Sequence, residues 1–393
     1  MQILKNKTNI DFISKRKPAL FLSTVLNLAI IVGIAAFGFN FGVDFAGGTV
    51  VELKFDHPIS AQEVRERAEK GGLPDVSVQN IGATEENTFL LRMGGVTQLN
   101  EESGAKGKAA LEALGGVRNV YADLPNGIIR FRAAQEIPVD SIKKAVEGSG
   151  IGVQEVRELG EAQGGTGYDY QVVASGMADR VFAALGQGLE KPDFEQRRVD
   201  YVGPQVGKQL RNRGIMALLY SMIAILIYVA FRFDFKFGPG ALVAMVHDVI
   251  MVAGYYLVSR REFNLTAIAA LLTVVGYSVN DTIVIYDRIR EDMAKFKGKP
   301  FAEVINIAIN DTLGRTILTS STTALSLIGL LIFGVGEIFD FAMAMLVGIV
   351  VGVYSTIYIA SPLTIWLDER AAARDAARQR EGGNIDQQHP KVA

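Results

Sequence analysis

Six long apolar runs alternate with polar segments along the chain. Each is about 20 residues long, which is the length of helix needed to cross a hydrocarbon layer ~30 Å thick. The runs cover residues 19–39, 215–231, 239–258, 265–285, 317–333 and 338–366. The stretch from about residue 44 to residue 213 contains no such run. The pattern therefore predicts a membrane protein with six spanning helices and one large water-exposed domain between the first and the second.

The first apolar run follows a basic stretch and can be compared with a cleavable signal peptide. The apolar part of a signal peptide has only about 7 to 15 residues, and the run 19–39 is longer. We therefore interpret this run as a retained membrane anchor.

Lysine and arginine near the ends of the spans predict the orientation, because cytoplasmic loops carry an excess of these residues. With six spans, the N-terminal arm, the loops after the second and fourth spans, and the C-terminal tail lie on one side, and all four are basic. Arg260 and Arg261, in the loop 259–264, are an exception on the opposite side. We expect both termini to be cytoplasmic and the large domain to be extracytoplasmic.

The large domain contains an internal repeat. Residues 49–93 line up with residues 127–174, and each copy continues into a helical stretch and a closing strand. Each copy has the order β-α-β-β-α-β, which is that of the split βαβ, ferredoxin-like fold. The predicted fold is thus a membrane all-α bundle of six transmembrane helices plus an extracytoplasmic α+β domain of two tandem ferredoxin-like βαββαβ repeats.

The expected boundaries follow from these patterns. They are a cytoplasmic arm 1–18, a first transmembrane helix 19–41, an α+β domain 42–212 with repeats at about 48–125 and 126–204, transmembrane helices two to six in 213–368, and a disordered cytoplasmic tail 369–393.

Composition narrows the possible functions. The formal net charge is −2, and no segment combines dense basic charge with aromatic residues, so we expect no nucleic-acid partner. The chain has no cysteine, which excludes disulfides, thiolate metal ligands and a thiol nucleophile. Neither repeat brings together a nucleophile, a base and an orienting group. We expect no catalytic residue, no metal and no cofactor, and a mechanical or docking role for the domain.

Ionisable residues within the spans are the strongest functional signal in the sequence. His247 and Asp248 lie halfway along the third span, and Asn280 and Asp281 lie in the fourth. A charge at the middle of a bilayer costs roughly 2.5 to 3.5 kcal/mol, so such residues are usually functional. A carboxyl there can take up and release a proton, and we favour that role for Asp248 over a structural one.

Further polar residues extend this set toward the cytoplasm. Arg288 lies seven residues beyond Asp281 and returns to the same helix face, so it is a candidate partner, and Asp287 precedes it. A stripe of hydroxyl residues follows one face of the fifth span: Thr316, Thr319, Ser320, Thr323 and Ser326. The stripe can conduct water or protons, or it can hold helices together by hydrogen bonds. Glycines are expected to permit close packing or sliding of helices at Gly329, Gly334, Gly336, Gly348 and Gly352.

Four segments in this order closely resemble the SecF family of bacterial protein-export subunits. They are FGVDFAGGT at 41–49, HD at 247–248, VVGYSVNDTIVIYDRIRE at 274–291 and TSSTTALSLIGLLIFG at 319–334. Six spans with the exported domain after the first also agree with this family. The family usually has one plait in that domain, whereas this sequence predicts two.

The resemblance implies a multi-pass protein of the bacterial inner membrane, related to the resistance-nodulation-division transporters. Its implied partners are SecD, the SecYEG channel, the translocating preprotein and membrane lipid. By motif, Asp248 would carry protons, and Asp281, Asp287 and Arg288 would be polar partners near the SecD interface. Residues Asp44, Gly47 and Gly48 would form the signature turn. The implied function is use of the proton motive force, with SecD, to drive late preprotein translocation.

Two other functions are compatible with the same features. One is half of a small-molecule or lipid efflux pump of the same superfamily, which would need a second half to reach the usual dozen spans. The other is a scaffold of the export channel that moves no protons.

Overall fold

The computed structural model describes residues 8–73, 76–81, 87–94, 99, 101–124, 127–161, 167–189, 191–233 and 236–388. These residues form two compact units, one comprising the chain up to Asn40 and from Gly214 onward, and the other comprising Phe41–Arg213. The predicted boundary between the repeats, at residues 125 and 126, lies outside the described residues.

The first unit is a helical bundle. A short 3-10 turn, η1 (Ile13–Lys15), leads into α1 (Arg16–Phe37). The later helices are α7 (Pro204–Arg232), α8 (Gly238–Ser259), α9 (Leu265–Lys295), α10 (Phe301–Phe333) and α11 (Glu337–Ser355), followed by a π-helical segment, η3 (Thr356–Ala360), and α12 (Ser361–Gln388). Six helical stretches among the described residues are long and apolar enough to cross a membrane, and the last of them runs through α11, η3 and α12. The prediction of six spans is confirmed.

Burial separates the spans into central and peripheral ones. Half or more of the apolar stretch is buried in α8, in α9 and in the span formed by α11, η3 and α12, whereas α1, α7 and α10 bury 11% or less. The bundle core includes Val229, Phe237, Tyr286 and Ile309, and Tyr286 is fully buried. The three central helices are thus the ones that can shield a polar side chain from lipid.

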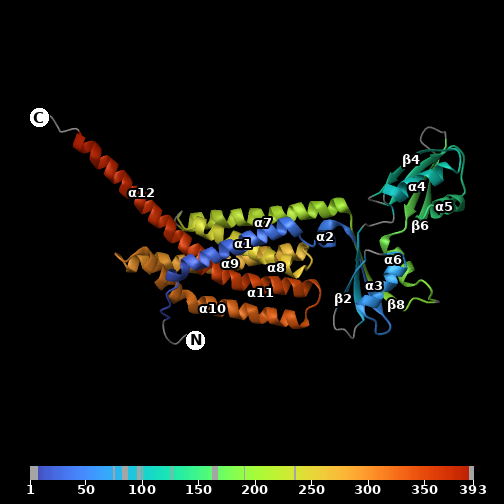
Figure 1. Ribbon diagram of the computed structural model, residues 1–393. Coiled ribbons are helices and arrows are strands. Elements are labelled where there is room, and N and C mark those ends of the chain that lie inside the picture. Colours follow the sequence, from blue (N-terminus) through green and yellow to red (C-terminus); the bar gives the residue numbers. More distant parts are fainter. Residues whose placement is uncertain are drawn as a thin grey trace. The chain divides into compact units, whose positions relative to one another are not determined.

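The C-terminal tail differs from the prediction. Residues after 368 were expected to be disordered, but α12 continues as a helix to Gln388 and extends beyond the other helices of the bundle in Figure 1. The segment DERAAARDAARQR contains mainly alanine, arginine and acidic residues. Alanine and arginine are strong helix formers, so the helix propagates from the preceding span although its residues up to 374 are exposed.

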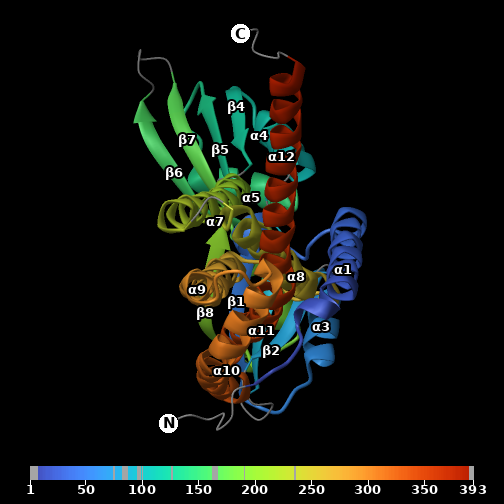
Figure 2. The same cartoon turned by 90° about the vertical axis from the view of Figure 1, so that its left-hand side faces the viewer.

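The second unit begins with α2 (Val43–Ala46) and has two antiparallel sheets with flanking helices (Figures 1 and 2). Its other elements are β1 (Gly48–Phe55), α3 (Ala61–Lys70), β2 (Ser77–Ile81), β3 (Thr88–Met93), α4 (Glu101–Glu112), β4 (Val117–Asp123), β5 (Ile128–Ala133), α5 (Val139–Gly148), β6 (Val153–Glu161), β7 (Tyr168–Ala174), α6 (Met177–Leu185) and β8 (Phe194–Val202). The order β-α-β-β-α-β therefore occurs twice, as predicted.

The pairing of the strands differs from two plaits in tandem. One sheet has the order β2-β3-β1-β8, and the other has the order β4-β5-β7-β6. The closing strand of the first repeat, β4, pairs with β5 of the second repeat, and the closing strand of the second repeat, β8, pairs with β1 of the first. The second sheet is therefore built from a continuous segment inserted between β3 and α6 of the first.

Each sheet has its own core. Val64 and Ala68 on α3 and Val181 on α6 pack with Leu53 and Phe89 of the first sheet. In the second sheet the corresponding core includes Leu111 on α4, Ile142 and Val146 on α5, and strand residues such as Phe131 and Tyr170. Helix α6 and strand β8, which close the second sequence repeat, therefore both belong to the first sheet: β8 pairs with β1, and α6 packs on that sheet.

Candidate functional site

The carboxylate of Asp248 lies at the junction of the three central helices. Its side chain is fully buried on α8. The Nδ1 atom of His247 lies 2.9 Å from Oδ1 of Asp248. The hydroxyl of Ser278 on α9 donates to Oδ2 at 2.5 Å, and the hydroxyl of Ser355 on α11 donates to the same oxygen at 2.8 Å. One carboxylate thus joins helices α8, α9 and α11.

Small residues on α11 allow this junction to form. A Cβ atom on Gly348 would lie 2.1 Å from Cγ2 of Val274 on α9, and one on Gly352 would lie 3.2 Å from Cβ of Ser278. Helices in membranes approach closely where such small residues face each other. The predicted close packing is confirmed at Gly348 and Gly352, where it lets Ser355 and Ser278 reach the same carboxylate. At Gly329 and Gly336 a Cβ atom would meet nothing within 4 Å, so these two do not mark close contacts.

A second layer of hydroxyls continues from Asp248 along the helix pair. The hydroxyl oxygens of Thr282 and Thr356 lie 3.0 Å apart, and Thr282 also donates to the carbonyl of Ser278. Thr356 is the first residue of the π-helical segment η3. Such segments interrupt the regular helix hydrogen bonding and are frequent at functional sites. The helix that carries Ser355 therefore has an irregular turn directly beside the carboxylate.

Tyr354 on α11 links the surroundings of this junction to the first span. Its ring lies 6.1 Å, centre to centre, from that of His247. The hydroxyl of Tyr354 donates to the carbonyl of Ala19 at 2.9 Å and lies 2.9 Å from the hydroxyl of Ser23, both on α1. The polar contacts of α1 with α11 therefore lie beside the His247–Asp248 pair.

Asp281 is a second buried carboxyl, on α9. It is 8% exposed, and the positive charge of Arg315 on α10 acts on it electrostatically. Thr316, next to Arg315, is 3% exposed, and its hydroxyl has no hydrogen-bond partner among the described residues. Asn280, the neighbour of Asp281, is exposed. Asn280 and Asp281 were predicted as members of one polar site, but only Asp281 faces the interior of the bundle.

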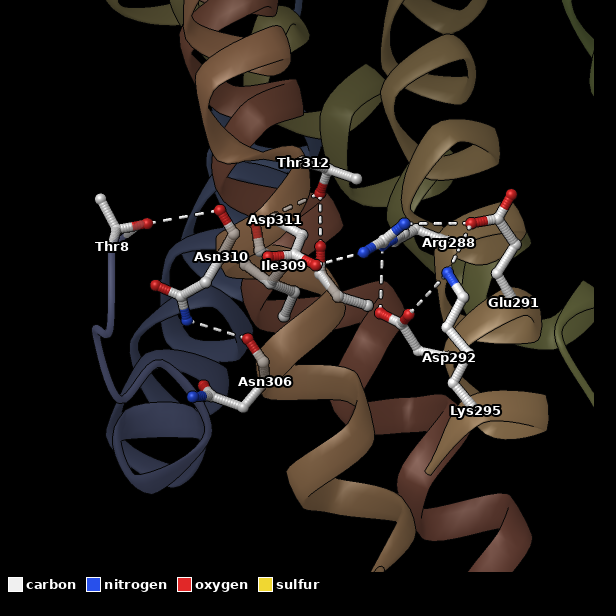
Figure 3. A network of polar contacts seen from close by, with 11 residues as sticks. Thr8, Arg288, Glu291, Asp292, Lys295, Asn306, Ile309, Asn310, Asp311 and Thr312 are labelled. Atoms are coloured by element: carbon white, nitrogen blue, oxygen red, sulfur yellow. Dashed lines mark hydrogen bonds and ion pairs between the residues drawn. The ribbon is translucent and has the colours of Figure 1, made fainter. Parts of the chain in front are cut away.

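Arg288 does not pair with Asp281 among the described residues. Its guanidinium instead binds Asp311 on α10, lies 3.1 Å from the fully buried Asp292, and lies 3.0 Å from Glu291 (Figure 3). The carboxylates beside Arg288 are therefore those of Glu291, Asp292 and Asp311, and not that of Asp281. Asp287 is exposed and lies 3.7 Å from Arg232 of α7.

The hydroxyl stripe of the fifth span does not reach Asp248 either. Thr319 and Thr323 donate to backbone carbonyls of their own helix, and Ser320 is half-buried. The hydroxyl of Thr323 also lies 3.0 Å from that of Tyr277 on α9. Within the described residues, the hydrogen bonds of the stripe thus go to the backbone of α10 and to Tyr277 of α9, whereas the hydroxyls that reach Asp248 come from Ser278 and Ser355.

The turn that contains Asp44 requires its glycines. Asp44 lies in the short helix α2, and Gly47 and Gly48 follow it with φ of 77° and 143°. A Cβ atom on Gly48 would lie 2.4 Å from the carbonyl oxygen of Met93 on β3. On the other side, Gly207 at the start of α7 packs against the backbone of this turn. The turn therefore joins the start of β1 to the start of α7.

Several contributing residues were not singled out by sequence reasoning, among them Ser355 and Arg315. Ser355 was part of an apolar run, although the spacing of Gly348, Gly352 and Ser355 marks one small-residue helix face that could have identified it. Arg315 was counted only as a cytoplasmic charge. Among the described residues, no cluster of three histidine, aspartate or glutamate residues could hold a metal ion.

Two known protein families match parts of this chain. Residues 181–370 match the family described as "Protein export membrane protein SecD/SecF, C-terminal", and residues 32–59 match the "SecD/SecF GG Motif". The first match includes Asp248, Asp281 and Ser355, and the second includes the turn at Asp44.

Relatives and solved structures extend the comparison to nearly the whole chain. The chain is 37% identical over 381 residues to the protein translocase subunit SecF of Magnetococcus marinus, covering 97% of this chain and 99% of the relative. It is 34% identical to that of Rickettsia bellii, covering 94% and 97%.

Among solved structures, SecDF from Thermus, described as a translocon-associated membrane protein, matches with a TM-score of 0.60 and 29% identity. SecDF in a super-membrane-facing form matches with a TM-score of 0.57 and 28% identity. The chain spans 40% of the length of each of these two chains. The chain therefore belongs to the SecF family of protein translocase subunits, which serve Sec protein export.

Proposed function

We propose that this chain uses the proton motive force, together with SecD, to drive late translocation of preproteins through the SecYEG channel. It would do so in the bacterial inner membrane, with both termini cytoplasmic and Phe41–Arg213 on the other side. The observation that carries the proposal is the fully buried carboxylate of Asp248, held by hydroxyls from two other helices. A buried ionisable group in a membrane is costly and is retained where it acts.

Protonation would change the hydrogen bonds at this junction. An ionised carboxylate only accepts, whereas a protonated one also donates. Ser355 has a second acceptor within reach, because its hydroxyl lies 3.1 Å from the carbonyl of Gly352. When Asp248 takes up a proton, the Ser355 hydroxyl can turn to that carbonyl, which loosens the link between α8 and α11 beside the irregular turn η3.

The available driving force is of the right size for such a change. Moving one elementary charge across a membrane is worth ~2.3 kcal/mol per 100 mV, and one pH unit adds ~1.4 kcal/mol. A buried hydrogen bond to a charged group contributes about 1.5 to 3 kcal/mol. One proton therefore carries enough free energy to exchange one packing of the helices for another.

Asp281 would be the second proton-carrying carboxyl, with Arg315 as its counter-charge. Arg288 would have a structural role, because Asp292 and Asp311 already bind it. His247 would orient Asp248. The α+β unit would move with the bundle and contact the emerging chain, and the turn at Asp44, Gly47 and Gly48 would transmit that movement through α7.

The test is Asp248→Asn in membrane vesicles that contain the full export complex. The amide has nearly the same shape and cannot be ionised, so we expect the complex to assemble while its proton-dependent stimulation of export is lost. Glu369→Gln on α12 is the matched control, because Glu369 is 60% exposed, and it should retain full stimulation. Full stimulation in Asp248→Asn would instead favour the non-conducting scaffold.

A further inference from the structure

An apolar cleft lies between α1 and α8, at the end of the bundle from which the chain leaves for the α+β unit. It has a volume of about 380 Å³ and is lined by Gly33, Phe37, Leu257, Val258 and Arg260. Phe37 is 74% exposed and Val258 is 82% exposed, so the cleft opens to the surroundings of the bundle. In a membrane those surroundings are lipid chains.

Arg260 is held in place at the end of this cleft. It follows the last residue of α8 with a left-handed backbone conformation, φ 53° and ψ 18°. The side chain of Asn40 donates to the carbonyl of Arg260 at 2.9 Å, and the backbone of Phe263 donates to the carbonyl of Asn40 at 2.8 Å. The rings of Phe39 and Phe263 stack at 4.6 Å. The end of α1 thus anchors the loop that carries this cation.

The charge of Arg260 is not neutralised within the described part of the chain. Its guanidinium makes one hydrogen bond there, from Nη1 to the carbonyl of Gly38 at 3.2 Å. The next residue, Arg261, differs, because it binds Asp340 at 2.5 Å and covers the ring of Phe339. A guanidinium has five N–H donors, so Arg260 has donors left for an anion.

We propose that this cleft binds a phospholipid, with an acyl chain against Gly33, Leu257 and Val258 and the phosphate on the guanidinium of Arg260. The two halves of the site match the two halves of the ligand, since the apolar walls suit the chain and the planar guanidinium suits phosphate geometry. A bound phosphate also explains why Arg260 lies on the side expected to be extracytoplasmic, where loops usually carry few lysines and arginines. The bound lipid would join α1 to α8, the helix that carries Asp248.

The cleft lies where α1 and α8 meet at small residues. A Cβ atom on Gly254 would lie 2.6 Å from Cδ1 of Ile30, and one on Gly33 would lie 2.7 Å from Cδ2 of Leu257. Both close contacts bring α1 and α8 together, and the side chain of Leu257 packs directly against the backbone at Gly33. The site is therefore a consequence of the helix pair itself.

The experiment uses the purified full chain in a neutral detergent, with phosphatidylglycerol or a diacylglycerol of the same chains as the probe. Bound lipid is counted by native mass spectrometry, and the thermal unfolding midpoint is followed in parallel. Phosphatidylglycerol should bind and raise the midpoint, whereas diacylglycerol, which has no phosphate, should bind less tightly by about fivefold. Equal binding of the two would overturn the role of the phosphate.

Variants separate the two halves of the site. Arg260→Gln should reduce phosphatidylglycerol binding to the level of diacylglycerol. Arg260→Lys keeps the charge but loses the planar fork, so its binding should be intermediate. Val258→Trp should block both lipids by filling the cleft. Arg290→Gln, at an exposed arginine near the other end of α9, is the matched control and should bind as the wild type does. If Arg290→Gln lowers binding as much as Arg260→Gln, the attraction is general and the site does not exist. Unchanged binding in both Arg260→Gln and Val258→Trp would also overturn the proposal.

Discussion

The hydroxyl of Ser355 donates a 2.8 Å hydrogen bond to the carboxylate of Asp248, although the two residues are 107 positions apart in the chain. Both are fully buried. The bond joins α8 to α11 at the last regular turn before η3, and it connects the candidate proton site to the only π-helical segment in the described part of the chain.

Removing this donor should destabilise the bundle. Ser355→Ala leaves a buried carboxylate with one hydroxyl donor fewer, which costs about 1 to 3 kcal/mol of the free energy of unfolding. Unfolding of the purified chain in mixed micelles, followed by circular dichroism, measures the loss. Ser326→Ala is the control, because its exposed hydroxyl bonds only to its own helix at Thr322, and it should change the free energy by less than ~0.5 kcal/mol. Equal losses in the two variants would contradict the assigned role of Ser355.

Close contact of α11 with α9 should make Gly348 intolerant of a side chain. In Gly348→Ala the new Cβ atom would meet Val274 at 2.1 Å, so the helices must separate, at a cost of about 1 to 3 kcal/mol of unfolding free energy. The same substitution at Gly276 on α9 meets no atom within 4 Å and should be neutral or stabilising by up to ~1 kcal/mol. Thermal unfolding of the two variants side by side tests the packing, and a stable Gly348→Ala would show that the helices do not meet there.

The strand pairing predicts which part of the α+β unit folds alone. A fragment of residues 99–176 contains α4, β4, β5, α5, β6 and β7, which is every element of the second sheet. We expect it to fold, with dispersed amide signals in NMR spectra. A fragment of residues 126–204, one whole sequence repeat, lacks β1 as the partner of β8 and lacks β4 as the edge of its own sheet. It should remain largely unfolded, and the reverse result would restore two separate plaits in tandem.

An ion pair across β5 and β7 should make the second sheet sensitive to acid. Arg132 and Asp169 are cross-strand neighbours joined by two hydrogen bonds of 2.7 and 3.0 Å. The guanidinium lowers the pKa of Asp169 below its ordinary value of 3.8. A lowered pKa stabilises the fold fully above the ordinary pKa, and this contribution is lost as the pH falls through the lowered one.

Urea unfolding of the fragment 99–176 can measure this contribution as a function of pH. Asp169→Asn should lower the unfolding midpoint at pH 7 and should leave it unchanged at a pH below the pKa of the folded Asp169. The variant Arg132→Gln and the double variant complete a cycle that isolates the pair. A constant difference between wild type and Asp169→Asn at every pH would mean that the charge of Asp169 contributes nothing.

Local features of the sequence determined much of this protein. The length of six apolar runs is enough to predict six spans, because a helix must satisfy its own backbone in lipid. The cost of a charge there is enough to single out Asp248 and Asp281. The β-α-β-β-α-β order could likewise be predicted, because apolar residues alternate along a strand and recur every three to four residues along a helix, and both patterns show within a short segment.

Only the tertiary structure decided which of these elements meet. Whether α10 or α11 faces Asp248 depends on Gly348 and Gly352 fitting against Val274 and Ser278, a fit between segments far apart in the chain. Arg288 binds Asp292, one turn further along α9, and Asp311 on α10. Spacing along one helix can reveal the first of these contacts but not the second. Two repeats with the same strand order can close separately or exchange their last strands. Both arrangements would make backbone hydrogen bonds of the same kind between strands. We therefore attribute the observed pairing to side-chain packing, above all that of α6 on the sheet that β8 joins.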